Sequence, residues 1–341
     1  MDASPITRVA VVGAGVMGSE IAWTAAAAGL DVVLLDADPA ALERGTAHIA
    51  AIGARRVAKG RMEAGEVDAV VARVVTATGD DALAGCDLAI EAVPEVLSIK
   101  HDVMGRLDAA LPPGALIASN TSGLSISEMA RGTGRPDRVL GLHFFNPASV
   151  MRLVEVVRGE TTSDATVAAG EALATALGKV PVLVRECPGF LVNRILVRAM
   201  SEAYRAAGAS GATAPAVDRA VVDGGPAPMG PYALGDLIGL DTMGHIRRDL
   251  EAAYGSRFDD GGAVDAQVAA GRLGAKTGAG FYDGGPPDGE ADADGRAAAE
   301  AYYAGALDEA RRCVAEGVAA AADVDLAMRH GCGWSAGPPG L

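Results

Sequence analysis

The sequence predicts an α/β domain with a doubly wound sheet, followed by an all-α domain that is partly duplicated. Short apolar runs alternate with helical patterns as far as residue 187, which is the order expected of βαβ units. From residue 188 onward the apolar positions follow helical spacing, and no alternating strand pattern is present. The length of 341 residues suits two domains, and half of the residues are apolar, which is ample for a core.

A glycine-rich turn follows the first predicted strand, which spans 8–12. The residues of this turn are Gly13, Ala14, Gly15, Val16, Met17 and Gly18. A helical pattern (19–28) and a second strand (31–35) come next. In such a βαβ unit Gly13 permits a tight turn, Gly15 allows the backbone to approach a pyrophosphate, and Gly18 allows close helix–strand packing. Because the helix N-terminus adds N–H groups and a positive dipole, this order predicts a Rossmann-type dinucleotide-binding domain.

The second predicted strand ends in Asp36. Its carboxylate can accept hydrogen bonds from both ribose hydroxyls of a dinucleotide and would repel a 2′-phosphate. No arginine follows within the next few residues. We therefore expect NAD rather than NADP as the cofactor, and FAD is the main alternative from the glycine motif alone.

Polar residues follow the next predicted strands, which span 70–75, 86–90 and 115–118. These polar residues are Glu91, Glu95, Ser119, Asn120, Thr121 and Ser122. Because ligands of open parallel sheets bind outside the carboxyl ends of the strands, we expect the side chains to line a site. The alternative is helix capping, since Ser, Thr and Asn favour N-cap positions.

Two apolar runs, 139–145 and 153–157, flank an Asn-Pro turn and predict an antiparallel hairpin. If the hairpin folds about Ser149, His143 lies opposite Glu155, with Cβ atoms about 5 Å apart. Histidine suits a general base at neutral pH, and a carboxylate fixes its tautomer and stabilises the imidazolium. The spacing therefore predicts a catalytic base with its orienting acid. The alternative is a buried histidine with a structural carboxylate partner.

The helical domain is expected to begin near Pro188, which would be the first residue of an apolar helix continuing over 190–200. This helix is apolar on most of its circumference, so Asn193 should be buried and hydrogen-bonded. Asn193 either braces a helix end or faces the active site, and we favour the second role. A further helix is expected over 229–242, and Lys276 lies in a glycine-rich loop.

The last part of the chain is an imperfect, ungapped copy of the helical domain at an offset of 107 residues. We expect an N-terminal domain over 1–187, a helical domain over 188–283, an acidic linker over 284–296 and a truncated second copy over 297–341. The matched positions include Asp218 with Asp325, Gly230 with Gly337, and Pro231 with Pro338. Because the copy is incomplete, its apolar surface should pack on the first copy or on another subunit.

The net charge of −15 and the lack of an extended Lys/Arg run argue against a nucleic acid or an anionic membrane as partner. The basic cluster at 55–61 is either a solvated helix face or an anion site for a phosphate-bearing ligand. Four scattered cysteines without a CxxC pair indicate neither a zinc site nor a disulfide framework. No apolar signal region and no run of eighteen apolar residues occur, so we expect a cytoplasmic protein.

The chain resembles the 3-hydroxyacyl-CoA dehydrogenase family, including the bacterial 3-hydroxybutyryl-CoA dehydrogenases, over residues 8–282. Six separate motifs carry the resemblance: the glycine turn at 13–18, Glu91-Ala-Val-Pro-Glu95, Ser119-Asn-Thr-Ser122, His143-Phe-Phe-Asn-Pro147 with Glu155, Pro188-Gly-Phe-Leu-Val-Asn-Arg194, and Lys276-Thr-Gly-Ala-Gly-Phe-Tyr282. The resemblance implies NAD as cofactor, reversible oxidation of a (3S)-3-hydroxyacyl-CoA, and a homodimer formed through the helical domain.

The resemblance also implies roles for single residues. His143 would be the base, oriented by Glu155, and Asn193 would hold the reacting oxygen or the thioester carbonyl. Ser122 would contact both the substrate and the nicotinamide ribose. Cofactor contacts are implied for Gly13, Gly15, Val16, Met17, Gly18, Asp36, Glu95, Lys100, Asn120 and Lys276, and substrate contacts for Asn146 and Lys59.

Departures from the family pattern keep alternatives open. Residue 123 is Gly where family members often have Ser, and the CoA-binding helix is poorer in lysine than usual, so an acyl carrier protein is the alternative carrier. The wider β-hydroxyacid dehydrogenases have Lys where this chain has Gly189, which argues against them. A catalytically silent NAD-binding protein is a further alternative, against which the intact His143 and Glu155 argue.

Overall fold

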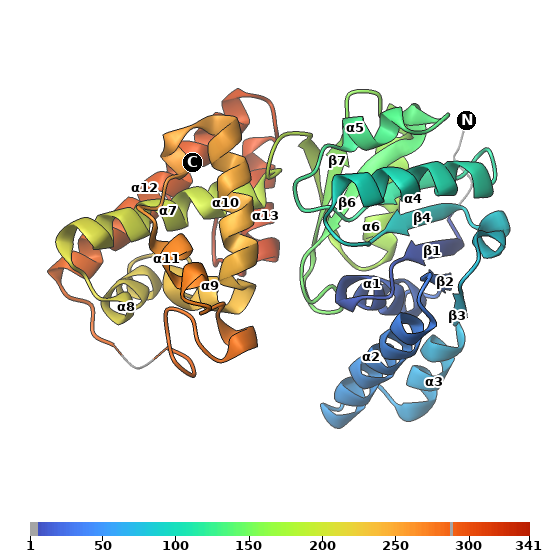
Figure 1. The fold of residues 1–341 in the computed structure, drawn as a ribbon, viewed down its shortest axis with the longest axis horizontal. Coiled ribbons are helices and arrows are strands. Elements are labelled where there is room, and N and C mark those ends of the chain that lie inside the picture. Colours follow the sequence, from blue (N-terminus) through green and yellow to red (C-terminus); the bar gives the residue numbers. More distant parts are fainter. Residues whose placement is uncertain (1–5, 287–288) are drawn as a thin grey trace. The chain divides into compact units, whose positions relative to one another are not determined.

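The computed structural model describes residues 6–286 and 289–341, and it divides the chain into two compact units, Met1–Glu186 and Cys187–Leu341 (Figure 1). The first unit is built around one sheet, and the second consists of helices. Residues 287 and 288 of the predicted acidic linker lie outside the described residues.

The first unit contains an eight-stranded sheet in the order β3-β2-β1-β4-β5-β6-β7-β8. All neighbouring strands are parallel except β6 and β7, which form an antiparallel pair. The strands are β1 (Arg8–Val12), β2 (Asp31–Leu35), β3 (Val74–Ala77), β4 (Leu88–Glu91), β5 (Leu116–Ser119), β6 (Val139–Phe144), β7 (Leu153–Arg158) and β8 (Val180–Arg185). The strand order reverses at β1, which lies between β2 and β4, so the predicted doubly wound fold is confirmed.

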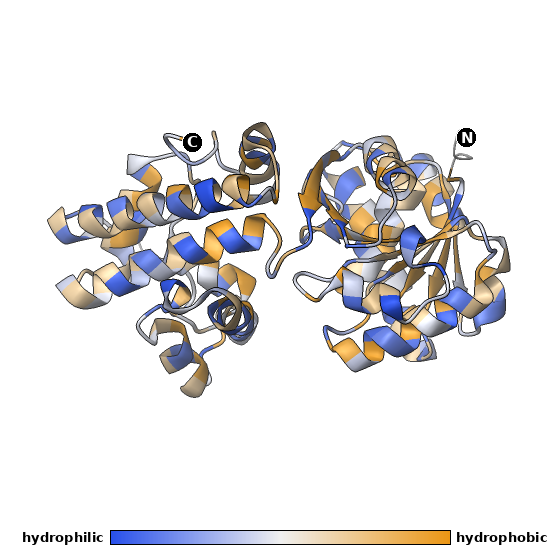
Figure 2. Cartoon of the chain, turned by 90° about the horizontal axis from the view of Figure 1, so that it is seen from above, coloured by the Kyte–Doolittle hydropathy of each residue, from blue (hydrophilic) through white to orange (hydrophobic). Residues whose placement is uncertain are grey.

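Helices cover both faces of this sheet (Figure 1). They are α1 (Val16–Ala27), α2 (Pro39–Ala58), α3 (Ala64–Ala72), α4 (Leu97–Ala110), α5 (Ile126–Arg131) and α6 (Asp164–Ala176), with two short 3₁₀ turns (Asp80–Gly85 and Pro136–Arg138). Side chains of α1, α2 and α6 share one apolar core with Val9 and Val11 of β1. The inner strands β1, β4 and β5 are apolar except at Arg8, Glu91 and Ser119, which stand at strand ends, because the strands are buried on both faces (Figure 2).

Two predicted boundaries in the first unit are wrong. The first helix begins at Val16 rather than at residue 19, because Gly15 already serves as its N-cap. The strand predicted at 70–75 is the end of α3 followed by β3, which starts at Val74. Val70 is β-branched and favours a strand locally, but it is buried in the core from the face of a helix, so tertiary packing overrides the local preference.

In the described residues of the second unit the regular secondary structure is helical, apart from two isolated bridges near residues 274–283. Its helices are α7 (Val192–Ser210), α8 (Ala214–Gly224), α9 (Pro231–Ile238), α10 (Leu240–Tyr254), α11 (Ala263–Ala269), α12 (Ala293–Ala315) and α13 (Ala321–Cys332), with 3₁₀ turns at Ser256–Phe258 and Ala275–Thr277. Helix α12 lies along α7 and also packs on α8 (Figure 1).

Three predicted helix limits in this unit are wrong. The first helix starts at Val192, because Gly189 and Phe190 both have positive φ values, +74° and +52°, which a right-handed helix cannot include. The helix expected over 229–242 is broken at Gly239, whose φ is +97°. Helix α12 begins at Ala293, inside the predicted linker, because Asp292 caps it by accepting a hydrogen bond from the N–H of Gly295.

The structure reproduces the sequence repeat as a local motif. Helices α8 and α13 start at positions 107 residues apart. Asp218 on α8 accepts hydrogen bonds from the N–H groups of Tyr232 and Ala233, and Asp325 on α13 accepts one from the N–H of Gly337. The second copy packs on the first through α12 and α13, both of which contact α7. The sequence left open whether the second copy packs on the first copy or on another subunit. In the structure it packs on the first copy.

Candidate active site

Two glycines of the β1–α1 turn leave no room for a side chain. Gly13 has a φ of +107°, and a Cβ there would lie 2.6 Å from the carbonyl oxygen of Ala92. A Cβ on Gly18 would lie 1.8 Å from the carbonyl oxygen of Gly13 and 3.5 Å from Val11 of β1. Gly18 therefore packs chiefly against the turn itself, and only secondarily against the strand.

Gly15 has a different environment, because a Cβ there would meet no atom within 4 Å. It is the N-cap of α1 and makes no side-chain cap hydrogen bond, so the first N–H groups of the helix face an open space that suits an anion. Asp36 accepts hydrogen bonds from Ala14 N (2.8 Å) and Asp38 N (3.0 Å), which holds its carboxylate beside the turn. Val16 is exposed and Met17 is half-buried on the first helical turn. The open glycine, the helix N-terminus and the fixed carboxylate fit the diphosphate and ribose of NAD.

The carboxyl ends of β4 and β5 carry a buried polar cluster. Glu91 is fully buried; its carboxylate accepts hydrogen bonds from Lys100 Nζ (2.7 Å), Val93 N (2.7 Å) and Ser119 Oγ (2.5 Å). Lys100, from α4, is only 1 % exposed and also pairs with Glu95 at 3.1 Å. Each buried charge thus has an opposite charge or a hydrogen-bonding partner, as burial requires.

The outer carboxylate of this cluster organises the loop after β5. Glu95 Oε1 accepts hydrogen bonds from Thr121 Oγ1 (2.5 Å) and Ser122 N (2.9 Å). Asn120 Oδ1 accepts one from Phe144 N (2.9 Å), which ties the end of β5 to β6. The structure therefore brings Glu95, Asn120 and Ser122 together at the sheet edge, where the sequence predicted them.

Sequence reasoning missed the structural use of Lys100. Its side chain lies inside the protein, where it pairs with Glu91 and Glu95 and so holds both carboxylates in place. The signal was present in the spacing, because Lys100, Val103, Met104 and Leu107 form the buried stripe of α4 at helical intervals.

The hairpin of β6 and β7 has the predicted register, with His143 directly opposite Glu155. His143 Nδ1 lies 2.6 Å from Glu155 Oε2, and the two side chains are 5 % and 0 % exposed. An ionised carboxylate only accepts hydrogen bonds, so Nδ1 carries the proton and Nε2 is the acceptor nitrogen of the neutral ring. The ring of Phe145 packs on the imidazole at a centroid distance of 4.5 Å. This arrangement can take up a proton at Nε2 and stabilise the resulting cation.

Three side chains from other elements hold the hairpin tip, and no sequence pattern pointed to two of them, Glu20 and Lys179. Glu20 of α1 accepts a hydrogen bond from Ser149 N (2.8 Å), and Arg56 of α2 donates to the carbonyl oxygen of the same residue (2.7 Å). Lys179 donates to the carbonyl oxygens of Ala148 and Met151. Burial, together with the nearby Arg56, lowers the pKa of Lys179 to about 8.

The remaining predicted substrate contacts of the first unit lie at its surface. Asn146 is exposed on the tip of the hairpin, and Lys59 is exposed at the C-terminal end of α2. Arg56, from the same basic cluster as Lys59, contacts the hairpin rather than solvent alone. The cluster is therefore partly structural.

Asn193 and Lys276 belong to the second unit, so a site that they share with His143 remains a prediction. Asn193 is half-buried on the first turn of α7, and the fully buried polar residue of that turn is Arg194, which corrects the sequence-based expectation. Lys276 Nζ lies 2.5 Å from Asp241 Oδ1, and this hydrogen bond lowers the pKa of Asp241.

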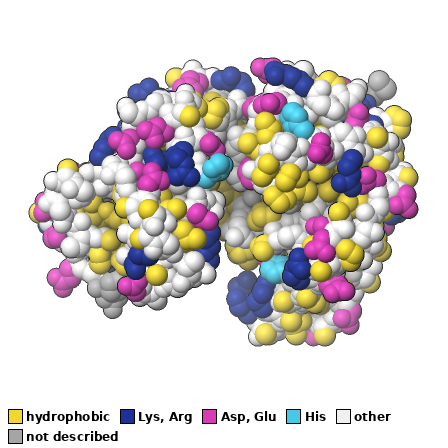
Figure 3. Space-filling model, viewed as in Figure 1, with side chains coloured by type: hydrophobic (Ala, Val, Ile, Leu, Met, Phe, Trp, Pro, Cys, Tyr) yellow, Lys and Arg dark blue, Asp and Glu magenta, His cyan; other side chains and the backbone are white. Residues whose placement is uncertain are grey.

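Other kinds of site find no support in the described part of the chain. Within residues 6–286 and 289–341 there is no group of three His, Cys, Asp or Glu side chains that could hold a metal ion. All four cysteines are present as thiols. None of the described helices is long and apolar enough to cross a membrane. Acidic and basic side chains are interspersed on the face shown in Figure 3.

The fold and the site define a class of protein: a dehydrogenase with a Rossmann-type nucleotide-binding unit and a histidine–carboxylate pair at the sheet edge. Comparison with known families gives the particular family. The NAD-binding domain of 3-hydroxyacyl-CoA dehydrogenase matches residues 8–187, and the C-terminal domain of 3-hydroxyacyl-CoA dehydrogenase matches residues 189–284. The chain belongs to the 3-hydroxyacyl-CoA dehydrogenase family.

Relatives of known sequence or structure agree with this assignment. A 3-hydroxybutyryl-CoA dehydrogenase of Bradyrhizobium diazoefficiens is 41% identical over 282 residues, covering 82% of this chain and 96% of the relative. The crystal structure of 3-hydroxybutyryl-CoA dehydrogenase from Escherichia coli K12 matches with a TM-score of 0.91 at 30% identity, covering 98% of this chain and 91% of that one. The (S)-3-hydroxybutyryl-CoA dehydrogenase structure from Ralstonia eutropha has a TM-score of 0.79 at 40% identity, covering 82% and 99%.

These matches establish the cofactor and the type of reaction. The protein is an NAD-dependent oxidoreductase that acts on the CH–OH group of a 3-hydroxyacyl-CoA. The predicted fold class, cofactor and enzyme class are thereby confirmed.

Proposed function

We propose that this enzyme oxidises short-chain (3S)-3-hydroxyacyl-CoA thioesters, such as 3-hydroxybutyryl-CoA, to their 3-oxo forms, with His143 as the general base. The observation that supports the role of His143 most directly is its buried 2.6 Å hydrogen bond to Glu155. The names of the relatives with about 41% identity support the short acyl chain.

In the proposed reaction His143 Nε2 takes the proton of the C3 hydroxyl while the C3–H bond breaks. When bound, NAD supplies the acceptor for the hydride that leaves C3. Glu155 keeps Nδ1 protonated and stabilises the imidazolium, so the proton stays on the ring as the hydroxyl becomes a ketone. Asn193 would donate a hydrogen bond to the reacting oxygen or the thioester carbonyl, and Ser122, held by Glu95 through its N–H, would orient the substrate and the nicotinamide ribose.

The first experiment is His143→Ala, assayed by NADH absorbance with acetoacetyl-CoA. Positioned acid–base catalysis contributes about 10²–10⁴-fold, so turnover should fall by at least about a hundredfold while NAD affinity stays close to that of the wild type. His245→Ala is the matched control, because this histidine is exposed on α10 and pairs only weakly with Asp249 at 3.5 Å. Near-normal turnover of His143→Ala would refute the assignment.

The carrier of the acyl group is tested in the same assay. We propose CoA, supported by the family of the chain and by the exposed Lys59 at the end of α2 as a phosphate contact, with Asn146 as a further contact to the substrate. Equal amounts of enzyme with acetoacetyl-CoA and with an acetoacetyl-carrier protein should give the higher kcat/KM for CoA. Preference for the carrier protein would favour the alternative of a biosynthetic dehydrogenase.

We also propose that the enzyme is a cytoplasmic homodimer, as the family resemblance implies. The presence of the four cysteines as thiols suits a reducing compartment. Because α12 of the same chain lies along α7, a dimer contact of the helical unit would use other surfaces than this one. Light scattering after size-exclusion chromatography gives the mass directly, and a monomer mass at all concentrations would rule out the dimer.

A further inference from the structure

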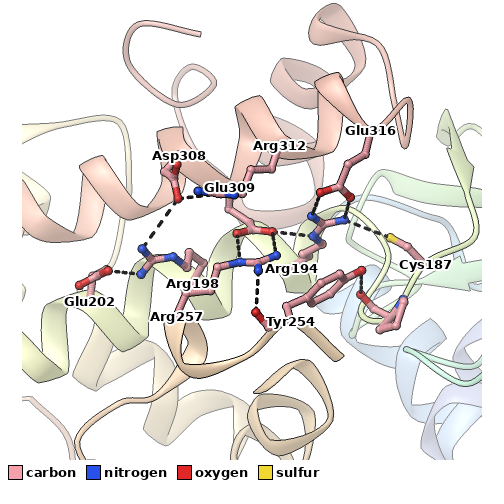
Figure 4. Close-up of polar contacts among 11 residues, drawn as sticks. Cys187, Arg194, Arg198, Glu202, Tyr254, Arg257, Asp308, Glu309, Arg312 and Glu316 are labelled. Carbon is pink, nitrogen blue, oxygen red and sulfur yellow. Dashed lines mark hydrogen bonds and ion pairs between the residues drawn. The ribbon is translucent and has the colours of Figure 1, made fainter. Parts of the chain in front are cut away.

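Arg194, the residue that follows Asn193, is bound by residues of the second copy (297–341), which we call the tail. Arg194 is 0 % exposed, and its guanidinium makes three hydrogen bonds to two carboxylates of α12 and its C-cap (Figure 4). Arg194 Nε donates to Glu309 Oε1 (2.6 Å), Nη1 to Glu316 Oε2 (2.7 Å) and Nη2 to Glu316 Oε1 (2.9 Å). Both glutamates lie beyond residue 284, where the match to the family's C-terminal domain ends.

The buried charge of Arg194 makes these carboxylates necessary. Burial by itself would lower the pKa of Arg194, but the hydrogen bonds to Glu316 and Glu309 raise it, so the guanidinium remains charged. Removing the partner of a buried charge is strongly destabilising for the segment that carries it. The ring of Tyr254 stacks on the guanidinium at 4.2 Å. Among the contacts described, the carboxylate partners of Arg194 are Glu309 and Glu316.

The start of α7 depends on such outside contacts. Asn193 and Arg194 are the second and third residues of the helix, and its N-cap residue, Leu191, makes no side-chain hydrogen bond. The preceding Phe190 has a φ of +52°, a left-handed conformation that is unfavourable for a non-glycine residue. The local sequence therefore does not favour this turn by itself.

The same network also holds the chain just before the turn. Arg194 Nη1 lies 3.8 Å from Cys187 Sγ, and the Tyr254 hydroxyl donates to the carbonyl oxygen of Pro188 at 3.3 Å. Arg257 donates a hydrogen bond to Glu309 at 2.9 Å, and its guanidinium lies over the ring of Tyr254. It therefore connects the carboxylate of Glu309 to the tyrosine (Figure 4). These contacts thus hold both the first turn of α7 and the segment just before it.

We propose that the tail is a positioning element of the active site: Glu309 and Glu316 hold Arg194 and thereby fix the orientation of Asn193. The proposal rests on the substrate-binding role given to Asn193 above. It assigns a task to the second copy of the helical unit. Glu309 and Glu316 are positioning residues, because they act through Arg194 and touch neither substrate nor cofactor in the proposed reaction.

The test is a double-mutant cycle of Glu316→Gln with Asn193→Ala in the full-length enzyme. Glu316 is 44 % exposed and Glu309 remains as a carboxylate partner of Arg194, so the replacement should leave the fold intact, which a melting curve checks. Small misplacements of positioning groups cost up to about a hundredfold in rate, and we expect Glu316→Gln to lower kcat by about tenfold with unchanged NAD affinity. In the Asn193→Ala background the same change should lower kcat by less than about twofold, because the group that it positions is already absent.

Arg312→Gln is the matched control, since Arg312 lies on the same helix and its partner is the exposed Asp308 at 3.0 Å; kcat should not change. An equal loss from Glu316→Gln in both backgrounds, or normal kcat in a folded Glu316→Gln enzyme, would overturn the proposal. If Glu316→Gln melts below the assay temperature, Glu316→Asp replaces it with the same two outcomes. An inactive wild type or an active His143→Ala enzyme would instead contradict the proposed reaction.

Discussion

At the scale of single residues, the carboxylate of Asp36 has two roles to consider: it accepts hydrogen bonds within the protein, and we expect it to select between NAD and NADP. Its two oxygens accept hydrogen bonds from Ala14 N and Asp38 N, which hold the carboxylate beside the β1–α1 turn. The negative charge at this point would repel a 2′-phosphate, whereas the remaining lone pairs can accept from ribose hydroxyls. The side chain therefore holds the turn, and we expect it to disfavour NADP.

Asp36→Asn tests both effects, because it removes the charge and leaves one acceptor oxygen for two backbone N–H groups. Hydrogen bonds to a charged group contribute about 1.5–3 kcal/mol, so the ratio of kcat/KM for NAD over that for NADP should fall by at least about tenfold. One of the two backbone N–H groups loses its acceptor, so the free energy of unfolding, measured in urea, should fall by about 1–3 kcal/mol. An unchanged cofactor ratio would show that Asp36 does not contact the ribose.

At the scale of elements, the β1–α1 turn shows that three glycines with one sequence pattern have three different environments. Gly13 needs its positive φ, Gly18 needs space beside the carbonyl of Gly13, and Gly15 has open space on its outer side. The first two requirements come from the protein. No contact within the protein requires the third glycine, and the phosphates of NAD would fill the open space beside it.

Gly15→Ala and Gly18→Ala should therefore fail in different ways. The methyl group at Gly15 meets no protein atom within 4 Å, so the melting temperature should stay within a few degrees of the wild type while NAD affinity falls by at least about tenfold. Gly18→Ala places a methyl group 1.8 Å from a backbone oxygen, and overpacking of this kind costs about 1–3 kcal/mol. Fluorescence titration with NADH and thermal melts measure both quantities; equal stability losses in the two variants would contradict this account.

At the scale of the whole molecule, the chain consists of two units that have separate cores. The nucleotide turn, Asp36 and the His143–Glu155 pair lie in the first unit, whereas Asn193 and Lys276 lie in the second. The first unit thus supplies the groups that fit NAD, and its stability should respond to NAD more than that of the second.

Hydrogen exchange in the presence of NAD tests this division. A ligand at one hundred times its Kd stabilises the unit that binds it by about 2.7 kcal/mol, which slows exchange that requires unfolding of that unit by about a hundredfold. We expect this slowing in β1, β2 and β4, with α7 and α12 changed much less. Equal slowing in both units would mean that they unfold together.

Features encoded by neighbours in the sequence could be predicted. The strand–turn–helix order located the nucleotide site, and the two apolar runs about Ser149 gave the register that pairs His143 with Glu155. Both succeed because the backbone geometry of a turn or a hairpin fixes which residues face each other within a few positions. The 107-residue repeat was also visible, because duplicated helices keep the residues of their turns.

The sequence by itself therefore determined the fold class, the cofactor and the His143–Glu155 pair, whereas the tertiary structure decided which polar side chains are buried and what holds them. Lys100 proved to lie inside the first unit, and Arg194 rather than Asn193 is the fully buried polar residue in the first turn of α7. The carboxylates that bind Arg194 come from more than a hundred residues further along the chain. Such partners follow no local period, because they meet only when separate helices pack, and their charges make that packing specific.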